Sequence, residues 1–435
     1  MFGVQLYKFR SQIMNFQAKY EYFRTGRIQS LILLVTIFQG FFQRASGQAA
    51  EFIAASLAKA GFENNRCILT DDKCYVSIEN HTFRWDIKAI SKALEIISAT
   101  VDTSLEINLL ILDIKIPQIL VRVKSADWRN YLLGLMDSNE LSGKLILTCC
   151  TQEAASKLSG VDVSNSGAGK FDLLIYPQIF FENTRTYKFY ETQINIAPAL
   201  EFSPWKGSRF TGQIIVPLHN DLGYEGDHIR PGLVTISQHV KFSDHLLGSL
   251  TAGNFAGGYY GVAADLRFSL FREQGSIELK SGLVGSSHFI DNEWIHSTLS
   301  SYTGSLSLAW FWPRFNMELK AGVARYINED YGLFATCLRR FNETSVGLYV
   351  QKNEYNNNGG FFFSIPLPGQ KRANRRFFRI SLPAQYEFVY NAGTEYFYGQ
   401  TLSTEPDPIY SGRFKWAESL KIMLINQKIV PNENN

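Results

Sequence analysis

The sequence predicts a mainly β protein, an antiparallel transmembrane β-barrel of about twelve strands preceded by a small α+β domain. Three observations predict this fold. Apolar and polar residues alternate along successive segments between residues 171 and 391. These segments run to about 10 residues, the length that a tilted membrane-crossing strand needs. Aromatic residues gather near the segment ends, where the two interfaces of a membrane would lie.

The alternation is clearest over residues 260–270. One face of this strand carries Tyr260, Val262, Ala264, Leu266, Phe268 and Leu270. The other face carries Gly261, Ala263, Asp265, Arg267 and Ser269. The pattern recurs over 276–283, 305–312, 315–323, 345–351 and 378–390. A secreted β-sandwich is the alternative, but small and charged residues suit a lumen and are costly in a soluble core.

Earlier segments of this region are less certain as strands. Residues 171–181, 194–202 and 210–218 each contain a proline, which weakens the assignment of a central strand. Residues 219–231 are rich in Gly, Asn and Asp and are predicted to form a longer loop. Residues 392–435 fit the barrel pattern poorly, and the sequence predicts no structure for this C-terminal tail.

The first 47 residues resemble an export signal. Arg24 and Arg27 precede an apolar stretch, and small residues at 45 and 47 suit cleavage before Gln48. The segment before the apolar stretch is long, so Met14 or a later position is a candidate start. A buried helix or a membrane anchor is the alternative, although the apolar stretch is shorter than the roughly 20 residues that span a bilayer.

Residues 48–160 have the pattern of an α+β domain that would lie in the periplasm. Helices are predicted over 49–60, 86–99 and 127–136, with Phe52 on the apolar face of the first and Asp86 as the N-cap of the second. Strands are predicted over 66–69, 75–78, 105–112, 119–123 and 144–148. Cys67 and Cys74 flank a hairpin turn, where a disulfide and free thiols are both open. Residues 161–170 are rich in Ser, Gly and Asn and are predicted to be a linker.

The distribution of charge argues against a nucleic-acid partner. The net charge is +3, but the leader holds six basic residues and one acidic residue. The rest of the chain therefore carries 37 basic and 39 acidic residues. A general nucleic-acid binder would keep a basic excess in its folded body.

Charged residues on the polar strand faces are the candidate functional residues. The predicted lumen-lining residues are Asp265, Arg267, Glu278, Lys280, Glu318 and Lys320. Opposite signs on neighbouring strands suit cross-strand pairs. These residues would either make a charge-balanced, rigid lumen or contact an acidic or neutral polysaccharide.

The sequence gives little sign of catalysis. Ser286, Ser287, His288 and Asp291, or His296 with Ser297, have the residue types of a hydrolase triad, but a triad is defined by geometry and not by adjacency. The seven histidines are scattered without metal-ligand spacing. We therefore expect no catalytic residue, no cofactor and no metal, and an outer-membrane hydrolase is only the third reading.

Short motifs are similar to those of a known family. Residues 57–64, 75–80 and 83–84 resemble the opening module of YjbH-like exopolysaccharide and capsule proteins. Residues 229–232 and 253–261 resemble short sequence segments of the barrel in the same family. The resemblance implies an outer-membrane β-barrel of a Gram-negative bacterium, a non-enzymatic channel or accessory in exopolysaccharide or capsule secretion. Its partners would be membrane lipid, polysaccharide and periplasmic export proteins. A general porin-like or structural barrel is the leading alternative.

Overall fold

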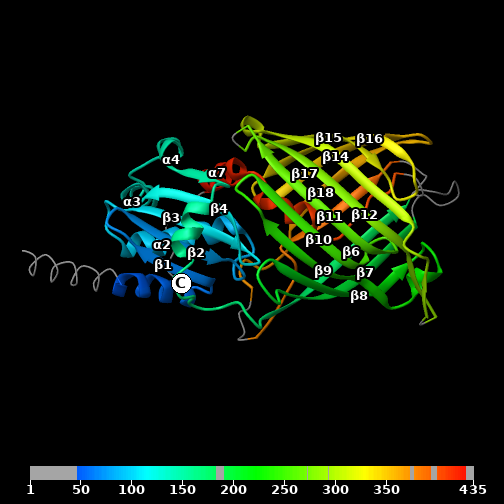
Figure 1. The fold of residues 1–435 in the computed structure, drawn as a ribbon, viewed down its shortest axis with the longest axis horizontal. Helices are drawn as coiled ribbons and strands as arrows, with labels where there is room; N and C mark the ends of the chain where they lie inside the picture. The colour runs from blue at the N-terminus through cyan, green and yellow to red at the C-terminus, as the bar shows by residue number, and fades with distance from the viewer. Residues whose placement is uncertain are drawn as a thin grey trace, which may run out of the picture. The chain divides into compact units, whose positions relative to one another are not determined.

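The structure is a computed structural model that describes residues 47–182, 191–271, 273–291, 293–372, 377–392 and 399–427. The predicted leader lies outside the described residues except for Gly47. The described chain is mainly β, with a small mixed sheet followed by a large, almost wholly antiparallel sheet (Figure 1). Among the described residues, every helix is too short or too polar to cross a membrane.

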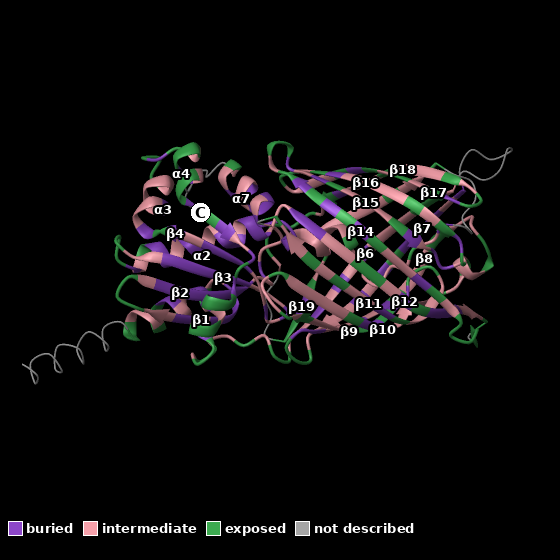
Figure 2. Cartoon of the chain, turned by 45° about the horizontal axis from the view of Figure 1, so that its top comes forward, coloured by how far each residue is buried: buried purple, intermediate pink, exposed green. Residues whose placement is uncertain are grey.

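The small sheet has five strands in the order β1-β2-β3-β4-β5, with β2 and β3 parallel and the other neighbours antiparallel. Its strands are β1 (Glu63–Leu69), β2 (Lys73–Glu79), β3 (Glu106–Asp113), β4 (Ile116–Lys124) and β5 (Ile146–Thr148). A helix over 47–59 precedes them. The other helices of this region are α2 (Asp86–Thr100), α3 (Ser125–Leu132), α4 (Ser138–Lys144) and α5 (Gln152–Leu158). Figure 2 shows that β2 and β3 are largely buried.

The apolar stripe of α2 holds this region together. Ile87, Ile90, Leu94 and Ile97 are at most 1% exposed, as their spacing predicts. Two predicted details are wrong. Trp85, and not Asp86, occupies the N-cap of α2; Asp86 is the first residue of the helix, and its carboxylate binds Arg413 at 2.8 Å. Phe52 is 61% exposed, whereas Ile53 and Leu57, predicted for the same apolar face, are buried.

A glycine in the turn after α3 gives a clean test of backbone strain. Gly134 has a φ of +72°, and a Cβ there would meet no atom within 4 Å. We expect Gly134→Ala to cost about 1 kcal/mol, because a left-handed conformation is strained for alanine. The matched control is Gly143→Ala inside α4, also in open space, which should stabilise by about 0.5–1 kcal/mol. Thermal unfolding of both variants measures the difference, and equal shifts would contradict the assigned turn.

Within the described residues the large sheet contains 15 strands, and the predicted number of about twelve is not confirmed. The first eight are β6 (Phe171–Glu182), β7 (Glu191–Phe202), β8 (Ser208–Asn220), β9 (Arg230–Lys241), β10 (Leu246–Phe255), β11 (Tyr259–Leu270), β12 (Gly275–Ile290) and β13 (Glu293–His296). The others are β14 (Ser301–Trp312), β15 (Met317–Arg325), β16 (Tyr331–Phe341), β17 (Thr344–Asn353), β18 (Asn357–Pro366), β19 (Phe378–Ser381) and β20 (Gln385–Asn391). From β6 to β18 each strand pairs with its neighbour in sequence, apart from β13, which pairs only with β12. Short 3₁₀ turns, η1 (Tyr224–Asp227) and η2 (Pro313–Phe315), interrupt the connections.

One face of the large sheet is apolar and exposed. The register places five apolar residues side by side across β11, β12, β14, β15 and β16. They are Leu266, Leu279, Leu306, Val323 and Leu333, which are 42%, 47%, 50%, 51% and 60% exposed. Figure 2 shows exposed stretches recurring along these strands. We call this row the apolar band; it follows from the two-residue period of the strands.

The two ends of the strand series are linked by one short segment. Within residues 378–391, β19 pairs in parallel with β6, and β20 pairs antiparallel with β18. Only residues 382–384 separate β19 from β20. The predicted last strand, 378–390, is therefore split, and its halves contact opposite ends of the series. Phe388 of β20 also lies 5.7 Å from Phe181 of β6, measured between ring centroids.

The C-terminal segment, residues 399–427, folds against the polar face of the large sheet. Ser403 forms a β-bridge with Ala256, and Trp416 stacks on Phe311 at 5.6 Å. The segment contains α6 (Pro408–Ser411), η3 (Gly412–Phe414) and α7 (Ala417–Asn426). Helix α7, red in Figure 1, continues to the small sheet and packs against β5 and α4.

Candidate functional site

The polar face of the large sheet surrounds a cavity of about 860 Å³. We call it the polar cavity. Amide side chains line it from several strands, namely Gln178, Gln193, Asn195, Gln213, Asn254 and Gln385. Aromatic residues line it as well, namely Tyr176, Tyr224 and Phe289. Its volume lies within the range of pockets that hold small ligands.

Two of the amides are buried, and in each of them one of the two polar side-chain atoms has no hydrogen-bond partner in the described structure. Asn195 on β7 is 1% exposed and donates from Nδ2 to Gln178 Oε1 at 3.4 Å. Gln213 on β8 is 2% exposed and accepts from the backbone N–H of Leu233 at 3.4 Å. Asn195 Oδ1 and Gln213 Nε2 have no hydrogen-bond partner in the described structure. A buried amide group without a partner costs about 1–3 kcal/mol, so the cavity presents one acceptor and one donor that a ligand would satisfy.

Acidic side chains outnumber basic ones in the lining of the polar cavity. Its lining includes the carboxylates of Glu182, Glu225, Glu387, Glu405 and Asp407. Arg230 and His288 are the basic side chains in the same lining. Glu225 pairs with His288 Nδ1 at 2.9 Å, and Glu387 accepts from the backbone N–H groups of Ile409 and Tyr410 at 3.0 and 2.7 Å. Helix α6 is thus held over the cavity through its first turn.

The residues that resemble a hydrolase triad do not form one in the described contacts. His288 bonds Glu225, not a serine. The Ser287 hydroxyl donates to Asn254 Oδ1 at 2.5 Å and accepts from Trp294 Nε1 at 2.9 Å. Asp291 accepts a hydrogen bond from Tyr224 at 2.9 Å. Ser287 and His288, successive residues of β12, therefore bond to different partners and not to each other.

The predicted lumen-lining residues form two groups on the polar face. Lys280 Nζ lies 3.6 Å from Asp265 Oδ2. Lys320 Nζ lies 2.8 Å from Glu278 Oε2. Arg267 is opposite Glu278 in the register of β11 and β12. Whether these residues line an open lumen stays a prediction, because the C-terminal segment also lies on this face.

A lysine of the C-terminal segment completes the second group. Lys415 Nζ lies 2.5 Å from Glu278 and 2.6 Å from Glu318, and its side chain is only 8% exposed. The Trp416 indole N–H donates to Glu318 at 2.6 Å, and Arg340 lies 3.5 Å from the same carboxylate. We call these residues the Lys415 cluster. Sequence reasoning missed Lys415, since its partners lie about 100 residues or more away and no local pattern marks it.

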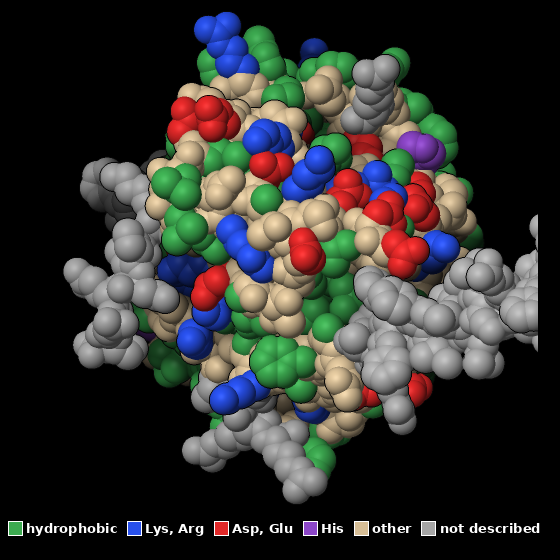
Figure 3. Space-filling view, turned by 90° about the vertical axis from the view of Figure 1, so that its left-hand side faces the viewer, with side chains coloured by type: hydrophobic (Ala, Val, Ile, Leu, Met, Phe, Trp, Pro, Cys, Tyr) green, Lys and Arg blue, Asp and Glu red, His purple; other side chains and the backbone are tan. Residues whose placement is uncertain are grey.

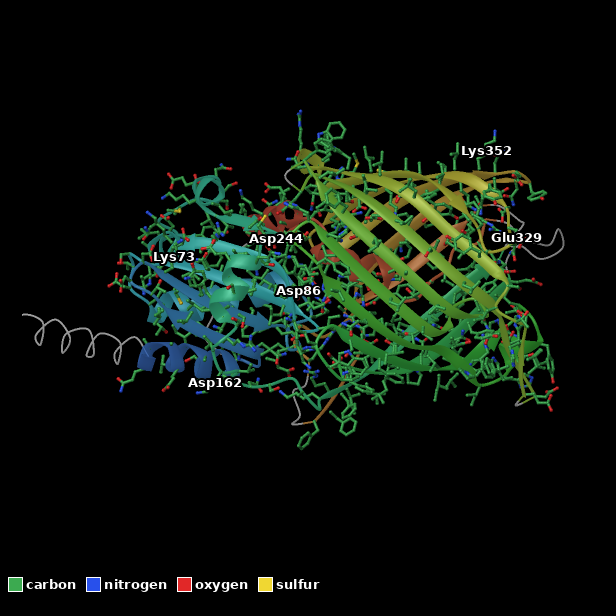
Figure 4. The ribbon with its side chains drawn as sticks, viewed as in Figure 1. Lys73, Asp86, Asp162, Asp244, Glu329 and Lys352 are labelled. Atoms are coloured by element: carbon green, nitrogen blue, oxygen red, sulfur yellow. The ribbon has the colours of Figure 1, made fainter. Side chains whose placement is uncertain are left out.

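A second network joins the small sheet to the large one. Arg379 of β19 binds Asp172 and Glu63, each at 2.6 Å. Asp244, in the turn between β9 and β10, accepts hydrogen bonds from the first N–H groups of α5, at 2.8 Å from Thr151 and 3.2 Å from Gln152. Figure 4 labels Asp86 and Asp244, both of which lie where the small-sheet region meets the rest of the chain; we call this contact region the junction.

The surface of the small-sheet region that faces the viewer in Figure 3 carries both positive and negative side chains.

A small cavity of about 110 Å³ in the junction contains His81. His81 Nε2 lies 3.4 Å from Glu79 and 3.9 Å from Glu63, and its Nδ1 lies 3.7 Å from Asp172. Burial alone would lower the pKa of His81, but hydrogen bonding to Glu79 and the charges of Glu79 and Glu63 raise it despite Arg379. Burial would likewise raise the pKa of Glu79, yet His81 holds it below its usual value.

These opposite shifts predict a pH-dependent contribution to stability. The His81 contribution is full below pH 6.5, the unfolded value, and is lost as pH rises through the raised pKa of the folded protein. The Glu79 contribution is present above pH 4.5 and is lost as pH falls through its lowered pKa. We expect the difference in melting temperature between the protein and its His81→Gln variant to be greatest between pH 4.5 and pH 6.5. The difference should decrease above pH 6.5. A difference that stays constant from pH 5 to pH 9 would contradict the pairing.

The described residues include no group of His, Cys, Asp and Glu able to hold a metal ion. All five cysteines are free thiols. Cys67 and Cys74 are diagonal neighbours in the register of β1 and β2, and their side chains contact each other.

No protein-family model and no curated protein matches the chain. Two mutants of the porin from Rh. blastica match in structure, with TM-scores of 0.25 and 0.24 at 7% and 8% sequence identity. Each match covers 46% of this chain and 90% of the porin chain. The function of the chain is therefore inferred from its own geometry.

Proposed function

We propose that the large sheet closes into a β-barrel in the outer membrane of a Gram-negative bacterium. We further propose that this barrel takes part in the export or surface assembly of a polysaccharide and catalyses no reaction. The apolar band is the observation that carries the location. Its five side chains stand side by side across five strands and are 42–60% exposed, which suits lipid far better than water.

Closure of the sheet is supported by the segment 378–391, whose two strands pair with β6 and with β18. Closure would remove the two open edges of the sheet. Only helices and closed barrels satisfy all of their backbone groups in lipid, and the described helices are too short or too polar to span a membrane. The first and last strands of the closed barrel would then be parallel, an arrangement that departs from the even strand numbers of bacterial barrels and has its precedent in an odd-stranded mitochondrial barrel.

A role in handling polysaccharide is supported by the polar cavity and by the family resemblance. Amide groups and aromatic rings are the groups that recognise hydroxyl-bearing ligands with apolar faces. The family resemblance of residues 57–64 and 253–261 points to the same class. The small-sheet region, which carries its own helices and strands, is the part proposed to meet periplasmic export proteins.

Cell fractionation tests the location. The full chain should sediment with the outer membrane, resist extraction by high salt or carbonate, and migrate faster on a gel when unheated. Recovery of the folded protein in the aqueous extract would contradict the proposal.

Deletion of the gene tests the role. Polysaccharide should be lost from the cell surface and restored by the full chain. A deletion strain with normal surface polysaccharide, together with a steady open conductance of the purified protein in planar bilayers, would favour a general porin.

A further inference from the structure

We propose that the polar cavity binds a neutral, hydroxyl-bearing glycan segment and excludes polyanionic glycans. This inference rests on the proposed function and specifies its ligand class. It starts from the unused donor and acceptor inside the cavity and from the sign of the charge around them.

The hydrogen-bonding groups match a sugar hydroxyl. Such a hydroxyl both donates and accepts, so it can donate to Asn195 Oδ1 or accept from Gln213 Nε2. Both atoms lie on side chains at most 2% exposed, and both lack a partner in the described structure. A site built to bond hydroxyl groups rejects ligands that lack them, because its buried polar groups would then stay unpaired.

The aromatic residues suit the apolar faces of sugar rings. Tyr176 and Phe289 line the same cavity as the two amides. The C–H faces of a pyranose pack on aromatic rings, while its equatorial hydroxyls point toward the surrounding amides. The combination of few oriented polar groups and aromatic walls is typical of small-ligand sites.

The charge of the cavity decides between neutral and acidic glycans. Five carboxylates line it, against one guanidinium and one imidazole. Glu225 is neutralised in part by His288, and Glu387 by the first N–H groups of α6. Burial raises the pKa of Asp407 well above its usual value, so the acidic excess that repels a polyanion in this partly enclosed space rests chiefly on Glu405.

The test uses the purified full-length protein in detergent micelles at physiological ionic strength. Calorimetric titrations compare three neutral hexasaccharides, cellohexaose, maltohexaose and N-acetylchitohexaose, with hexagalacturonate. At least one neutral probe should bind at least about tenfold more tightly than hexagalacturonate. This factor corresponds to the free energy of about one hydrogen bond. Equal or tighter binding of hexagalacturonate would overturn the inference, and so would failure of all three neutral probes to bind a protein that fractionates with the outer membrane. Failure to fractionate there would count against the proposed function instead.

Variants locate the binding. Gln213→Leu should weaken the neutral probe about tenfold. The matched control is Ile214→Ala on the same strand, whose side chain is 52% exposed on the opposite face and which should leave the affinity unchanged. Glu405→Gln should strengthen hexagalacturonate binding. The titration of this variant tests the inference even if Gln213→Leu does not fold. Unchanged affinities in Gln213→Leu and Glu405→Gln would place binding elsewhere.

Discussion

Replacing Lys415 by alanine is expected to destabilise the protein by about 3–5 kcal/mol, the usual cost of removing one partner from a buried ion pair. Lys415 contacts two carboxylates, Glu278 at 2.5 Å and Glu318 at 2.6 Å, in a place where it is 8% exposed. Lys320 and Arg340 remain to offset part of the charge, so we expect the lower half of the range. The loss should appear as a lower free energy of unfolding in urea and as faster proteolysis of the C-terminal segment.

The matched control is Lys144→Ala. Lys144 also makes a lysine–carboxylate pair, with Asp127 at 2.8 Å, but its side chain is 48% exposed. Exposed pairs contribute about 0–1 kcal/mol, so this variant should unfold almost like the natural protein. Equal losses for the two variants would show that the Lys415 cluster does not hold the segment in place.

Leu266→Arg should cost about 2–4 kcal/mol if the residue lies near the middle of the membrane, because an arginine there must leave water for lipid. Leu266 is 42% exposed and stands beside Leu279 in the apolar band. The free energy of unfolding in lipid vesicles measures the cost.

The comparison variant changes the next residue, Asp265, to asparagine. Its side chain is on the polar face and 40% exposed, where it pairs loosely with Lys280 at 3.6 Å. We expect a cost below about 1 kcal/mol. Equal tolerance of the two substitutions would mean that the apolar band does not face lipid.

The sequence was sufficient to predict the alternating strands. Residues 260–270 and 305–312 alternate cleanly, and strands β11 and β14 include them. The two-residue period is a local property, so it is visible without any tertiary information. The prolines at 177, 198 and 217 weakened three strand assignments, yet β6, β7 and β8 include them, with irregular register near 194–195 and 212–214.

Several elements escaped prediction because their sequences carry weaker signals. Residues 230–241, 246–255, 331–341 and 357–366 form β9, β10, β16 and β18 but were not assigned individually. The short helices α4 and α5 were also missed, since seven residues give too few turns to show an apolar stripe. The N-terminal N–H groups of α5 are satisfied by Asp244, a residue about 90 positions further along the chain.

The candidate site was only partly visible in the sequence. The charged residues of the polar face could be identified because they alternate with apolar neighbours. The buried amides Gln193 and Asn195 alternate with Ile194 and Ile196 in the same manner, so that signal was available. Residues 399–427 gave no such signal, because Lys415 and Trp416 are fixed by partners on distant strands and not by local periodicity.

The parallel contact between β19 and β6 has a mechanical consequence. These strands share four register pairs, from 171 to 174, whereas β6 and β7 share eleven. Each register pair contributes to the hydrogen-bonded ladder, so pulling apart β19 and β6 breaks far fewer bonds than separating β6 from β7. In a closed barrel this joint would act as a lateral seam. A chain held inside would then have a sideways exit into the plane of the membrane, in addition to any route along the barrel axis.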